Sequence, residues 1–312
     1  MSHTHEDHDH DHEDHDHSGP LVELVTLRDW LRYAVTRFNR AQLFFGHGTD
    51  NAWDEAVYLM LHTLALPLDR LEPFMDACIP IEERVTLLEV IERRVESRMP
   101  AAYLTGEAWL AGYRFRVDPR VIVPRSYFAA LLADGLSPWI DDPEALTRVA
   151  DVCTGSACLA IMMANTFPNA EVDAVDLSAD ALAVAADNVA DYALEAQVHL
   201  HQGDALTPLA GQRYDLILSN PPYVTAEAMA ALPAEYRHEP EMALAAGDDG
   251  LDVVRSLIAQ ARAHLNPGGL LMVEVGHNRH LVEAAFPDLP LTWLSDDHAE
   301  DMIFMLREDE LP

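Results

Sequence analysis

The sequence predicts an α/β protein, in which helices cover both faces of a mostly parallel sheet and a smaller helical domain comes first. Three observations favour this fold class. Apolar residues recur at helical spacing in the first hundred residues, short apolar runs alternate with helical segments from about residue 148, and one such run ends in Asn220-Pro221-Pro222-Tyr223. Strands that alternate with helices favour a parallel sheet, because each helix carries the chain back to the start of the next strand.

The chain begins with a tail of unusual composition. Residues 1–20 alternate His with Asp or Glu, with seven His and seven acids, so we expect them to be disordered. Such a tract either binds divalent metals through neutral imidazole or is only a solvated extension, and both interpretations stay open. After this tail we expect three further parts, at 21–100, 101–124 and 125–312.

The second part, 21–100, predicts a helical domain. Apolar residues fall on one face over 25–45, with Thr26 as a plausible N-cap, and further helices are expected over 54–66 and 81–99. The third part, 101–124, has aromatic and β-branched residues punctuated by glycine, which predicts a hairpin or linker.

The fourth part, 125–312, carries the alternation of strands and helices. Strands are expected at 148–153, 171–176, 197–202, 213–220 and 269–276, helices at about 155–167, 178–192 and 249–264, and a late pair of strands at 291–296 and 302–307.

The composition is strongly acidic. There are 53 acidic residues against 20 basic ones, every basic one is arginine, and the formal net charge is −33. Such a surface repels phosphate backbones, so we expect no direct nucleic-acid ligand, whereas a basic protein would be attracted. A salt-rich cytoplasm or a GC-rich genome explains the same bias with no partner at all.

Three cysteines, Cys78, Cys153 and Cys158, are too few for a disulfide framework and fit a reducing compartment. No apolar run reaches the roughly 18 residues that a membrane span needs. The N-terminus has neither the basic nor the apolar region of a signal peptide. We therefore expect a cytoplasmic protein with no membrane contact.

The first strand–helix turn of the sheet reads DVCTGSACLAI, from Asp151 to Ile161. Gly155 permits a tight turn and a close approach of a ligand to the backbone. The G-x-G-x-x-G fingerprint of dinucleotide sites is missing, and the acid Asp151 would repel a pyrophosphate. The turn suits a ligand that carries an ammonium and a sulfonium, so we expect S-adenosyl-L-methionine in contact with Asp151, Cys153, Thr154, Gly155 and Ser156.

Two more acids follow the next two strands. Asp176, followed by Leu177, ends the second strand 21 residues after Gly155, where a carboxylate accepts both ribose hydroxyls of a nucleoside. Asp204 lies at the tip of the third strand, where it either accepts from the adenine amino group or only caps its loop.

The stretch Asn220 to Tyr223 stands at the carboxyl edge of the sheet, where open α/β folds bind ligands. Proline has no N–H, so the oxygens of the Asn220 side chain and of the Pro221 carbonyl are free to accept the two N–H groups of a planar NH2. Pro222 stiffens the turn, and Tyr223 offers a flat face to a planar amide or base. Two acceptors orient the NH2 and stabilise the positive charge that develops when its nitrogen attacks a methyl group.

These motifs together resemble the protein-(glutamine-N5) methyltransferase family. The resemblance covers nearly all of the chain after the tail. It is closest to the branch that modifies the third protein of the large ribosomal subunit. The segments that carry it are GHGTDNAWDEA (46–56), RMPAAYLTGEAWLAGYRFRVDPRVIVPRS (98–126), DVCTGSACLAI, SNPPYV and HEPEMALAAGDDGLD (238–252). A sister branch that acts on peptide chain release factors shares the Asn-Pro-Pro-Tyr.

The resemblance implies a class I S-adenosylmethionine-dependent fold, Rossmann-like, with a seven-stranded sheet. It also implies that Asn220 to Tyr223 hold the substrate glutamine, and that Asn220 lines the cofactor site as well. No metal is needed for the reaction that it implies. The helical domain with the hairpin is then the part that selects a ribosomal protein, before or during assembly. Ala157 departs from the family, which commonly has a second glycine there. Arg125 either binds a carboxylate of cofactor or substrate or only pairs with a surface acid.

Two other hypotheses compete with a protein-(glutamine-N5) methyltransferase. An N6-adenine DNA methyltransferase also uses Asn-Pro-Pro-Tyr, but it needs basic contacts to phosphate, and without the tail there remain 46 acidic against 20 basic residues. A non-catalytic assembly module need not keep Asp151, Gly155, Asp176 and Asn220 to Tyr223 together.

Overall fold

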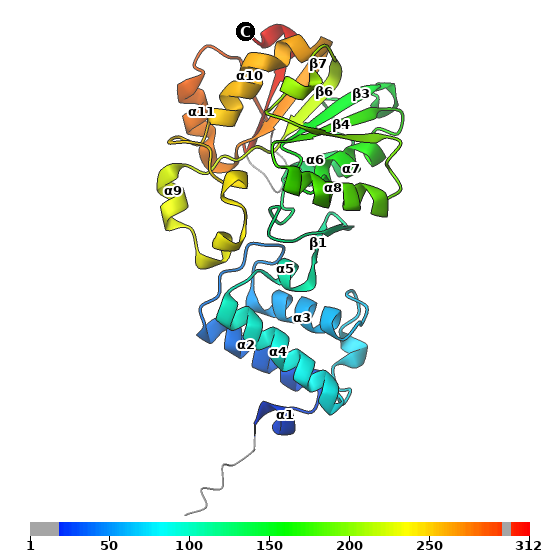
Figure 1. Ribbon diagram of the computed structural model, residues 1–312, viewed down its shortest axis with the longest axis vertical. Helices are drawn as coiled ribbons and strands as arrows, with labels where there is room; N and C mark the ends of the chain where they lie inside the picture. The colour runs from blue at the N-terminus through cyan, green and yellow to red at the C-terminus, as the bar shows by residue number, and fades with distance from the viewer. Residues whose placement is uncertain (1–18, 295–300) are drawn as a thin grey trace, which may run out of the picture.

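The computed structural model describes residues 19–294 and 301–312, and Figure 1 shows a helical part joined to a larger sheet-containing part. The tail expected at 1–20 lies outside these residues except for its last two positions. The end of the strand expected at 291–296 also lies outside them. No helix in the described stretches is long and apolar enough to cross a membrane.

The helical part consists of α1 (Pro20–Glu23), α2 (Leu27–Arg40), α3 (Ala52–Thr63), α4 (Ile81–Ser97) and α5 (Ala101–Thr105). Thr26 caps α2 as expected: its hydroxyl accepts the N–H of Asp29, whose carboxylate accepts the N–H of Thr26. The apolar face of α2 is buried, with Trp30 and Phe38 fully inaccessible in the core of this part.

A two-stranded hairpin, β1 (Glu107–Leu110) and β2 (Tyr113–Arg116), connects the two parts. Its two-residue turn, Ala111-Gly112, has positive φ at both positions, the geometry that matches the twist of a hairpin. The hairpin was expected within 101–124, but its start was wrong, because 101–105 form α5, which Gly106 ends in a left-handed conformation.

The larger part is built on a sheet of seven strands: β3 (Arg148–Val152), β4 (Glu171–Asp176), β5 (Val198–Gln202), β6 (Tyr214–Ser219), β7 (Leu265–Glu274), β8 (Thr292–Leu294) and β9 (Ile303–Arg307). Their order is β5-β4-β3-β6-β7-β9-β8, and only β9 pairs antiparallel with its neighbours. The chain reverses its direction of growth between β3 and β6, and ligands bind beyond the carboxyl ends of strands at such a switch point.

Helices cover both faces of this sheet (Figure 1). One face packs against α6 (Phe128–Ala133), α7 (Cys158–Thr166) and α8 (Ala179–Asp191), and the other against α10 (Asp252–His264) and α11 (Arg279–Ala285). The sequence patterns did not predict α6 and α11, which are only six and seven residues long. Short 3-10 turns complete the chain: η1 (Glu72–Phe74), η2 (Pro143–Ala145), η3 (Thr207–Leu209), η4 (Ala234–His238), η5 (Glu241–Ala243), η6 (Gly276–Asn278) and η7 (Glu308–Glu310).

The segment after β6 forms the joint between the two parts. It contains α9 (Ala226–Ala231), η4 and η5, and in Figure 1 it descends from the sheet toward the helical part. Glu235 in this segment is fully buried; its Oε1 accepts the N–H of Phe44 at 3.0 Å and lies 2.8 Å from Nη2 of Arg98. The loop that follows Asn220 to Tyr223 is therefore anchored on the helical part.

Candidate active site

A cavity of about 300 Å³ opens at the carboxyl ends of β3, β4, β5 and β6. Of the residues expected at a cofactor site, six line it: Cys153, Gly155, Asp176, Leu177, Asp204 and Asn220. Pro222 lines it too, while Asp151, Thr154, Ser156, Pro221 and Tyr223 lie behind the lining or beside it. The strands bring these residues together because each of them lies at, or shortly after, the carboxyl end of a strand.

The turn after β3 winds tightly around the base of this cavity. Cys153, Gly155 and Ala157 have φ of 65°, 55° and 63°. Only glycine adopts this left-handed region without strain, so Cys153 and Ala157 each hold the turn at some cost. Ala157 thus adopts a conformation that glycine adopts without strain.

Asp151 lies under this turn and is almost fully buried. Its Oδ2 accepts the hydroxyl of Thr154 at 2.6 Å and the N–H of Ala160 at 3.0 Å. Its Oδ1 is buried and has no hydrogen-bond partner among the described residues. Burial raises the pKa of Asp151 to about 7, although these two donors oppose the shift.

Asp176 joins the first two strand ends. Its carboxylate accepts the N–H groups of Gly155 and Ser178, at 2.8 and 2.9 Å, and its main-chain oxygen accepts the N–H of Gly203 at 3.0 Å. Burial raises its pKa, against the pull of these N–H groups. The exposed Asp204 follows Gly203 and faces the same cavity.

Thr154 and Ser156 support the turn instead of lining the cavity. The Thr154 N–H donates to the main-chain oxygen of Val175, and the oxygen of Ser156 accepts the Asn188 amide at 2.9 Å. Both residues are buried. Their contacts fix the turn against β4 and α8.

The residues around this cavity fit S-adenosyl-L-methionine better than a dinucleotide. Asp176 and Asp204 stand on its wall, and Asp151, whose Oδ1 has no partner, directly precedes the lining residues Val152 and Cys153, so a cation is favoured and a pyrophosphate is not. The carboxylate of Asp176 has lone pairs left for a ribose after its two main-chain bonds. Within the described residues, no group of three His, Cys, Asp or Glu side chains is arranged to hold a metal.

The Asn-Pro-Pro-Tyr stretch begins directly after β6. Ser219 is fully buried and its hydroxyl donates to the oxygen of Val152 at 2.7 Å, which locks the ends of β3 and β6 together. The side chain of Asn220 makes no hydrogen bond with residues 19–294 or 301–312, and it lines the cavity. Its amide is thus free to bind a ligand at the cavity's edge.

Tyr223 is held on its main chain and on its ring. Its main-chain oxygen accepts the Asn278 amide at 2.6 Å, and a Cβ at Gly250 would lie only 2.4 Å from that oxygen. A Cβ at Gly276 would lie 2.9 Å from the ring carbon Cε2. Close approach at Gly250 therefore fixes the main chain of the tyrosine, and close approach at Gly276 fixes the plane of its ring.

Glu274, at the end of β7, is a buried acid next to this tyrosine. Its Oε2 accepts the Ser126 hydroxyl at 2.6 Å and the Tyr127 N–H at 3.0 Å, and its Oε1 lies 3.5 Å from the Tyr223 hydroxyl. Burial raises the pKa of Glu274 to about 7. The sequence analysis missed this residue; an acid that ends the apolar run GLLMVEVG was the available signal.

Arg125 does not line the cavity, and its guanidinium does not pair with an acid on the protein surface. Its Nη1 and Nη2 bind the buried carboxylate of Glu239, at 2.5 and 2.7 Å, and its guanidinium lies over the ring of Tyr236. His47 from the helical part lies 3.5 Å from Glu239 Oε2, without hydrogen-bond geometry. The expectation of a surface acid was wrong, because the acid that Arg125 pairs with is buried.

A seven-stranded sheet in this order, with an acid at the end of its second strand and a free asparagine amide at the end of its fourth, defines a class I S-adenosylmethionine-dependent methyltransferase. Residues 131–235 match the model of the methyltransferase small domain family. The chain belongs to the family of the ribosomal protein uL3 glutamine methyltransferases.

The two uL3 glutamine methyltransferases that carry this assignment match almost end to end. The ribosomal protein uL3 glutamine methyltransferase of Burkholderia pseudomallei is 57% identical over 294 residues, which covers 92% of this chain and 96% of that protein. The one of Bordetella pertussis is 56% identical over 289 residues, covering 93% and 97%. A solved ribosomal protein L11 methylase from Lactobacillus delbrueckii subsp. bulgaricus aligns with a TM-score of 0.40 and 23% identity, over 57% of this chain and 77% of that one.

Proposed function

We propose that this chain methylates the side-chain amide nitrogen of a glutamine in ribosomal protein uL3. The observation that carries the proposal is the free Asn220 amide at the edge of the cavity. The two prolines that follow it have no N–H, so they cannot donate to the oxygens that would accept a substrate NH2. The relatives' names supply the protein that carries the glutamine. Such a protein is made in the cytoplasm, and we propose that the enzyme acts there.

S-adenosyl-L-methionine, when bound, supplies a methyl group on a positively charged sulfur. In our proposal Asp176 accepts the ribose hydroxyls, Asp204 accepts from the adenine amino group, and Asp151 attracts the ammonium through its unpartnered oxygen. Cys153, Gly155 and Leu177 contact the cofactor as part of the lining, and Thr154 and Ser156 act through the turn that they brace.

The amide nitrogen is a poor nucleophile because its lone pair is shared with the carbonyl. Asn220 Oδ1 and the Pro221 carbonyl oxygen each accept one N–H of the substrate NH2, which orients the nitrogen toward the methyl group. As the new N–C bond forms and the methyl–sulfur bond breaks with its electron pair left on sulfur, positive charge passes to nitrogen, where the same two oxygens would stabilise it. The nitrogen then releases one proton to water and returns to a neutral, methylated amide.

Tyr223 packs its ring against the substrate amide plane in this mechanism. Its own position is set by Gly276 on the ring and by Glu274 near the hydroxyl. Burial raises the pKa of the Tyr223 hydroxyl, so it stays protonated at neutral pH. Pro222 completes the cavity wall between Asn220 and the tyrosine.

The test is transfer of labelled methyl groups from S-adenosyl-L-methionine. The enzyme, its Asn220→Ala variant and a control Asn169→Ala variant, whose exposed amide binds only the oxygen of Glu144, receive free uL3, assembled large subunits, a release factor or adenine-containing DNA. We expect label on free uL3, unchanged in the control and reduced at least about 100-fold by Asn220→Ala.

Each of these candidate substrates tests a different part of the proposal. Label on the release factor instead of uL3 would keep the chemistry and overturn the substrate, and label on DNA would overturn the protein-substrate proposal. We infer that modification precedes completion of the subunit, so assembled subunits should accept little label. Equal labelling of free and assembled uL3 would contradict that timing.

A further inference from the structure

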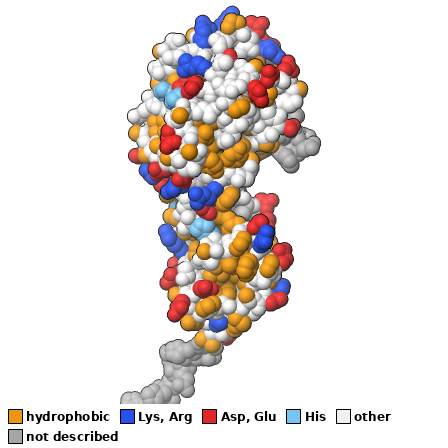
Figure 2. Space-filling model, turned by 90° about the vertical axis from the view of Figure 1, so that its right-hand side faces the viewer, with side chains coloured by type: hydrophobic (Ala, Val, Ile, Leu, Met, Phe, Trp, Pro, Cys, Tyr) orange, Lys and Arg blue, Asp and Glu red, His pale blue; other side chains and the backbone are white. Residues whose placement is uncertain are grey.

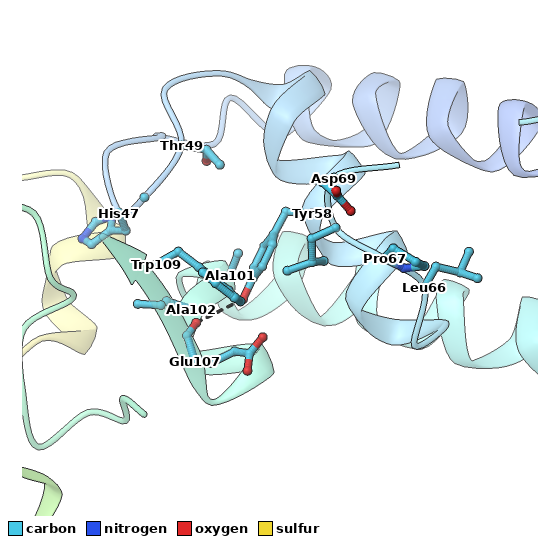
Figure 3. Close-up of a pocket in the computed structure, with 13 residues that line it drawn as sticks. His47, Thr49, Tyr58, Leu66, Pro67, Asp69, Ala101, Ala102, Glu107 and Trp109 are labelled. Atoms are coloured by element: carbon cyan, nitrogen blue, oxygen red, sulfur yellow. Dashed lines mark hydrogen bonds between the residues drawn. The ribbon is translucent and has the colours of Figure 1, made fainter. Parts of the chain in front are cut away.

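A second, larger cavity lies away from the cofactor site. It measures about 710 Å³ and lies between the helical part and β1, and its lining is mainly apolar, with Tyr58, Leu66, Leu68, Ala102 and Trp109 among the residues that form it. Figure 3 labels Tyr58, Leu66, Ala102 and Trp109, with Trp109 and Ala102 on the side of the hairpin and Leu66 on the side of the helical part. We call this cavity the hairpin groove.

The surroundings of the hairpin groove are unusually apolar for a surface. Trp109 keeps 43% of its surface exposed, and hydrophobic side chains gather over the helical part and its junction with the sheet on the face drawn in Figure 2. A volume between about 300 and 1,000 Å³ is typical of sites that bury a ligand or a side chain. Large exposed apolar surface that borders such a hollow marks an interaction site.

The main chain of β1 supplies an unfilled edge beside this hollow. In a hairpin with a two-residue turn, every second pair of residues points its N–H and C=O outward. On β2 these outward groups are hydrogen-bonded to side chains of α8 and its C-terminal end. Tyr192 Oη lies 2.9 Å from the main-chain nitrogen and 3.0 Å from the main-chain oxygen of Arg114. The Asn188 side-chain amide binds both the N–H and the main-chain oxygen of Arg116.

On β1 only one outward residue is satisfied in the same way. The oxygen of Glu107 accepts the Tyr58 hydroxyl at 3.1 Å, and its N–H reaches the hydroxyl of Thr105. Trp109 is the next outward residue, and its N–H and C=O have no hydrogen-bond partner within the described part of the chain. An extended peptide fits such an open edge by adding a strand.

The rim of the hairpin groove is acidic. Asp69, whose Oδ2 lies 3.9 Å from Nε of Arg70, lines the groove, and a neighbouring hollow that shares Gly48 and Thr49 with it contains Asp50 and Asp54. Among the described residues, Asp50 and Asp54 contact only the neutral amide of Asn51 through their side chains, with no cation beside them. The occupant of this groove should therefore carry positive charge.

We propose that the hairpin groove binds an extended, basic segment of the methylated protein, which pairs with the main chain of Trp109 and inserts an apolar side chain beside Tyr58 and Leu68. The proposal rests on the proposed function, because it takes uL3 as that protein. The chain's own tail and a second copy of the chain are disfavoured as occupants, since the tail carries seven acids and the whole chain a charge of −33.

The first test compares Trp109→Arg and Leu68→Arg with Val85→Arg. Val85 is an apolar residue on α4, 39% exposed and outside the groove, so it controls for added charge on the helical part. We expect KM for free uL3 to rise about tenfold or more in the two groove variants, with kcat and cofactor affinity unchanged, since the lost contacts are made equally before and during the reaction. KM that stays unchanged, or rises equally in Val85→Arg, would overturn the proposal.

The second test needs no substitution. Amide hydrogen exchange of the enzyme is measured with and without uL3 in the presence of S-adenosyl-homocysteine. The Trp109 amide should exchange at least about tenfold more slowly in the complex, while the Arg114 amide, already bound by Tyr192, should not change. An unprotected Trp109 amide in a formed complex would contradict the strand pairing.

The two proposals fail in different ways. The groove proposal is overturned, and the proposed function is kept, if uL3 is labelled while KM is unchanged in the groove variants and the Trp109 amide gains no protection. No label on uL3 from the unaltered enzyme overturns both, because the groove's occupant is defined as that substrate.

Discussion

Arg125 and Glu239 are joined by two nitrogen–oxygen contacts of 2.5 and 2.7 Å, across 114 residues of sequence. The carboxylate is fully inaccessible, and it also accepts the N–H of Val123 at 3.0 Å. This pair connects the segment that enters the catalytic part with the segment that follows Asn220 to Tyr223, the stretch proposed to clamp the substrate amide. A buried acid of this kind is tolerated only while its partners remain.

Replacing Arg125 by Ala should destabilise the protein by about 3 to 5 kcal/mol, because Glu239 would keep its charge in a buried site. Chemical denaturation at pH 7 measures this loss. The control is Arg116→Ala, which removes a similarly bidentate but exposed pair with Asp191 and should cost clearly less. Equal losses in the two variants would mean that burial adds nothing to the Arg125–Glu239 pair.

The same pair predicts an acid-sensitive stability. Burial alone would raise the pKa of Glu239, but nearby His47 and Arg125 outweigh it and lower the pKa from 4.5 to about 2. A lowered pKa stabilises the fold above pH 4.5, and this contribution of about 3 kcal/mol is lost as the pH falls toward 2. Unfolding free energies of the enzyme and of Glu239→Gln, measured from pH 6 to pH 2.5, should converge as the pH falls. Parallel curves would contradict this linkage.

Asp176→Ala should weaken cofactor binding. The variant loses the acceptor proposed for the ribose and also the two main-chain bonds that shape the turn at Gly155. Charge-assisted bonds contribute about 1.5 to 3 kcal/mol each, so we expect the Kd for S-adenosyl-L-methionine to rise about 10- to 100-fold. Calorimetric titration measures it, with Asp180→Ala, an exposed acid in the first turn of α8, as the control. A Kd within twofold of the unaltered enzyme would remove Asp176 from the cofactor site.

Cofactor affinity should also depend on pH through Asp151. Burial raises the pKa of its carboxyl to about 7, so it is mostly neutral at pH 5.5 and half ionised near pH 7. The ionised form attracts the cofactor's ammonium, and the Kd should therefore fall on the order of tenfold between these two pH values. Asp151→Asn should bind more weakly at pH 7 and lose most of this dependence. A slope that persists in Asp151→Asn would assign it to another group, such as Asp176.

Gly276→Ala should impair catalysis without weakening cofactor binding. The added Cβ would lie 2.9 Å from the Tyr223 ring, so the ring must leave the plane in which it packs on the substrate amide. We expect kcat to fall about tenfold or more. Gly268→Ala is the matched control: this glycine also has positive φ, 79° against 54°, but nothing lies within 4 Å of its Cβ position. It should lose stability but keep kcat, and equal kcat in the two variants would show that the ring position is unimportant.

Much of this fold was predictable because its signals are local. The strands at 148–153, 171–176 and 213–220 were found within a residue or two, since continuous apolar runs between glycine and polar residues mark the strands of a parallel sheet. The short α6 and α11 carry too few turns for a periodic pattern, and they form only because the sheet offers them a surface. The helix α5 was missed although Pro100 and Gly106 bracket it.

The candidate site was predictable only where its residues follow strand ends. Asp176 and Asn220 are found by counting along the chain, because the carboxyl ends of parallel strands share one edge. The roles of Glu239 and Glu274 depend on partners 114 and 148 residues away, which no spacing in the sequence reveals. The burial of Asp151 beneath the turn likewise follows from packing, not from the motif.

The segment after Tyr223 has one more consequence. It runs to the helical part, where Glu235 meets Phe44 and Arg98, and returns to pair Val224 with Ala245 beside the clamp. The helical part and the Asn220 to Tyr223 stretch are therefore coupled through one segment of the chain. A truncated enzyme that lacked the helical part would lose the contacts of Glu235 with Phe44 and Arg98 that anchor this segment, and under the proposed function it would be inactive even toward a free glutamine side chain too small to need recognition.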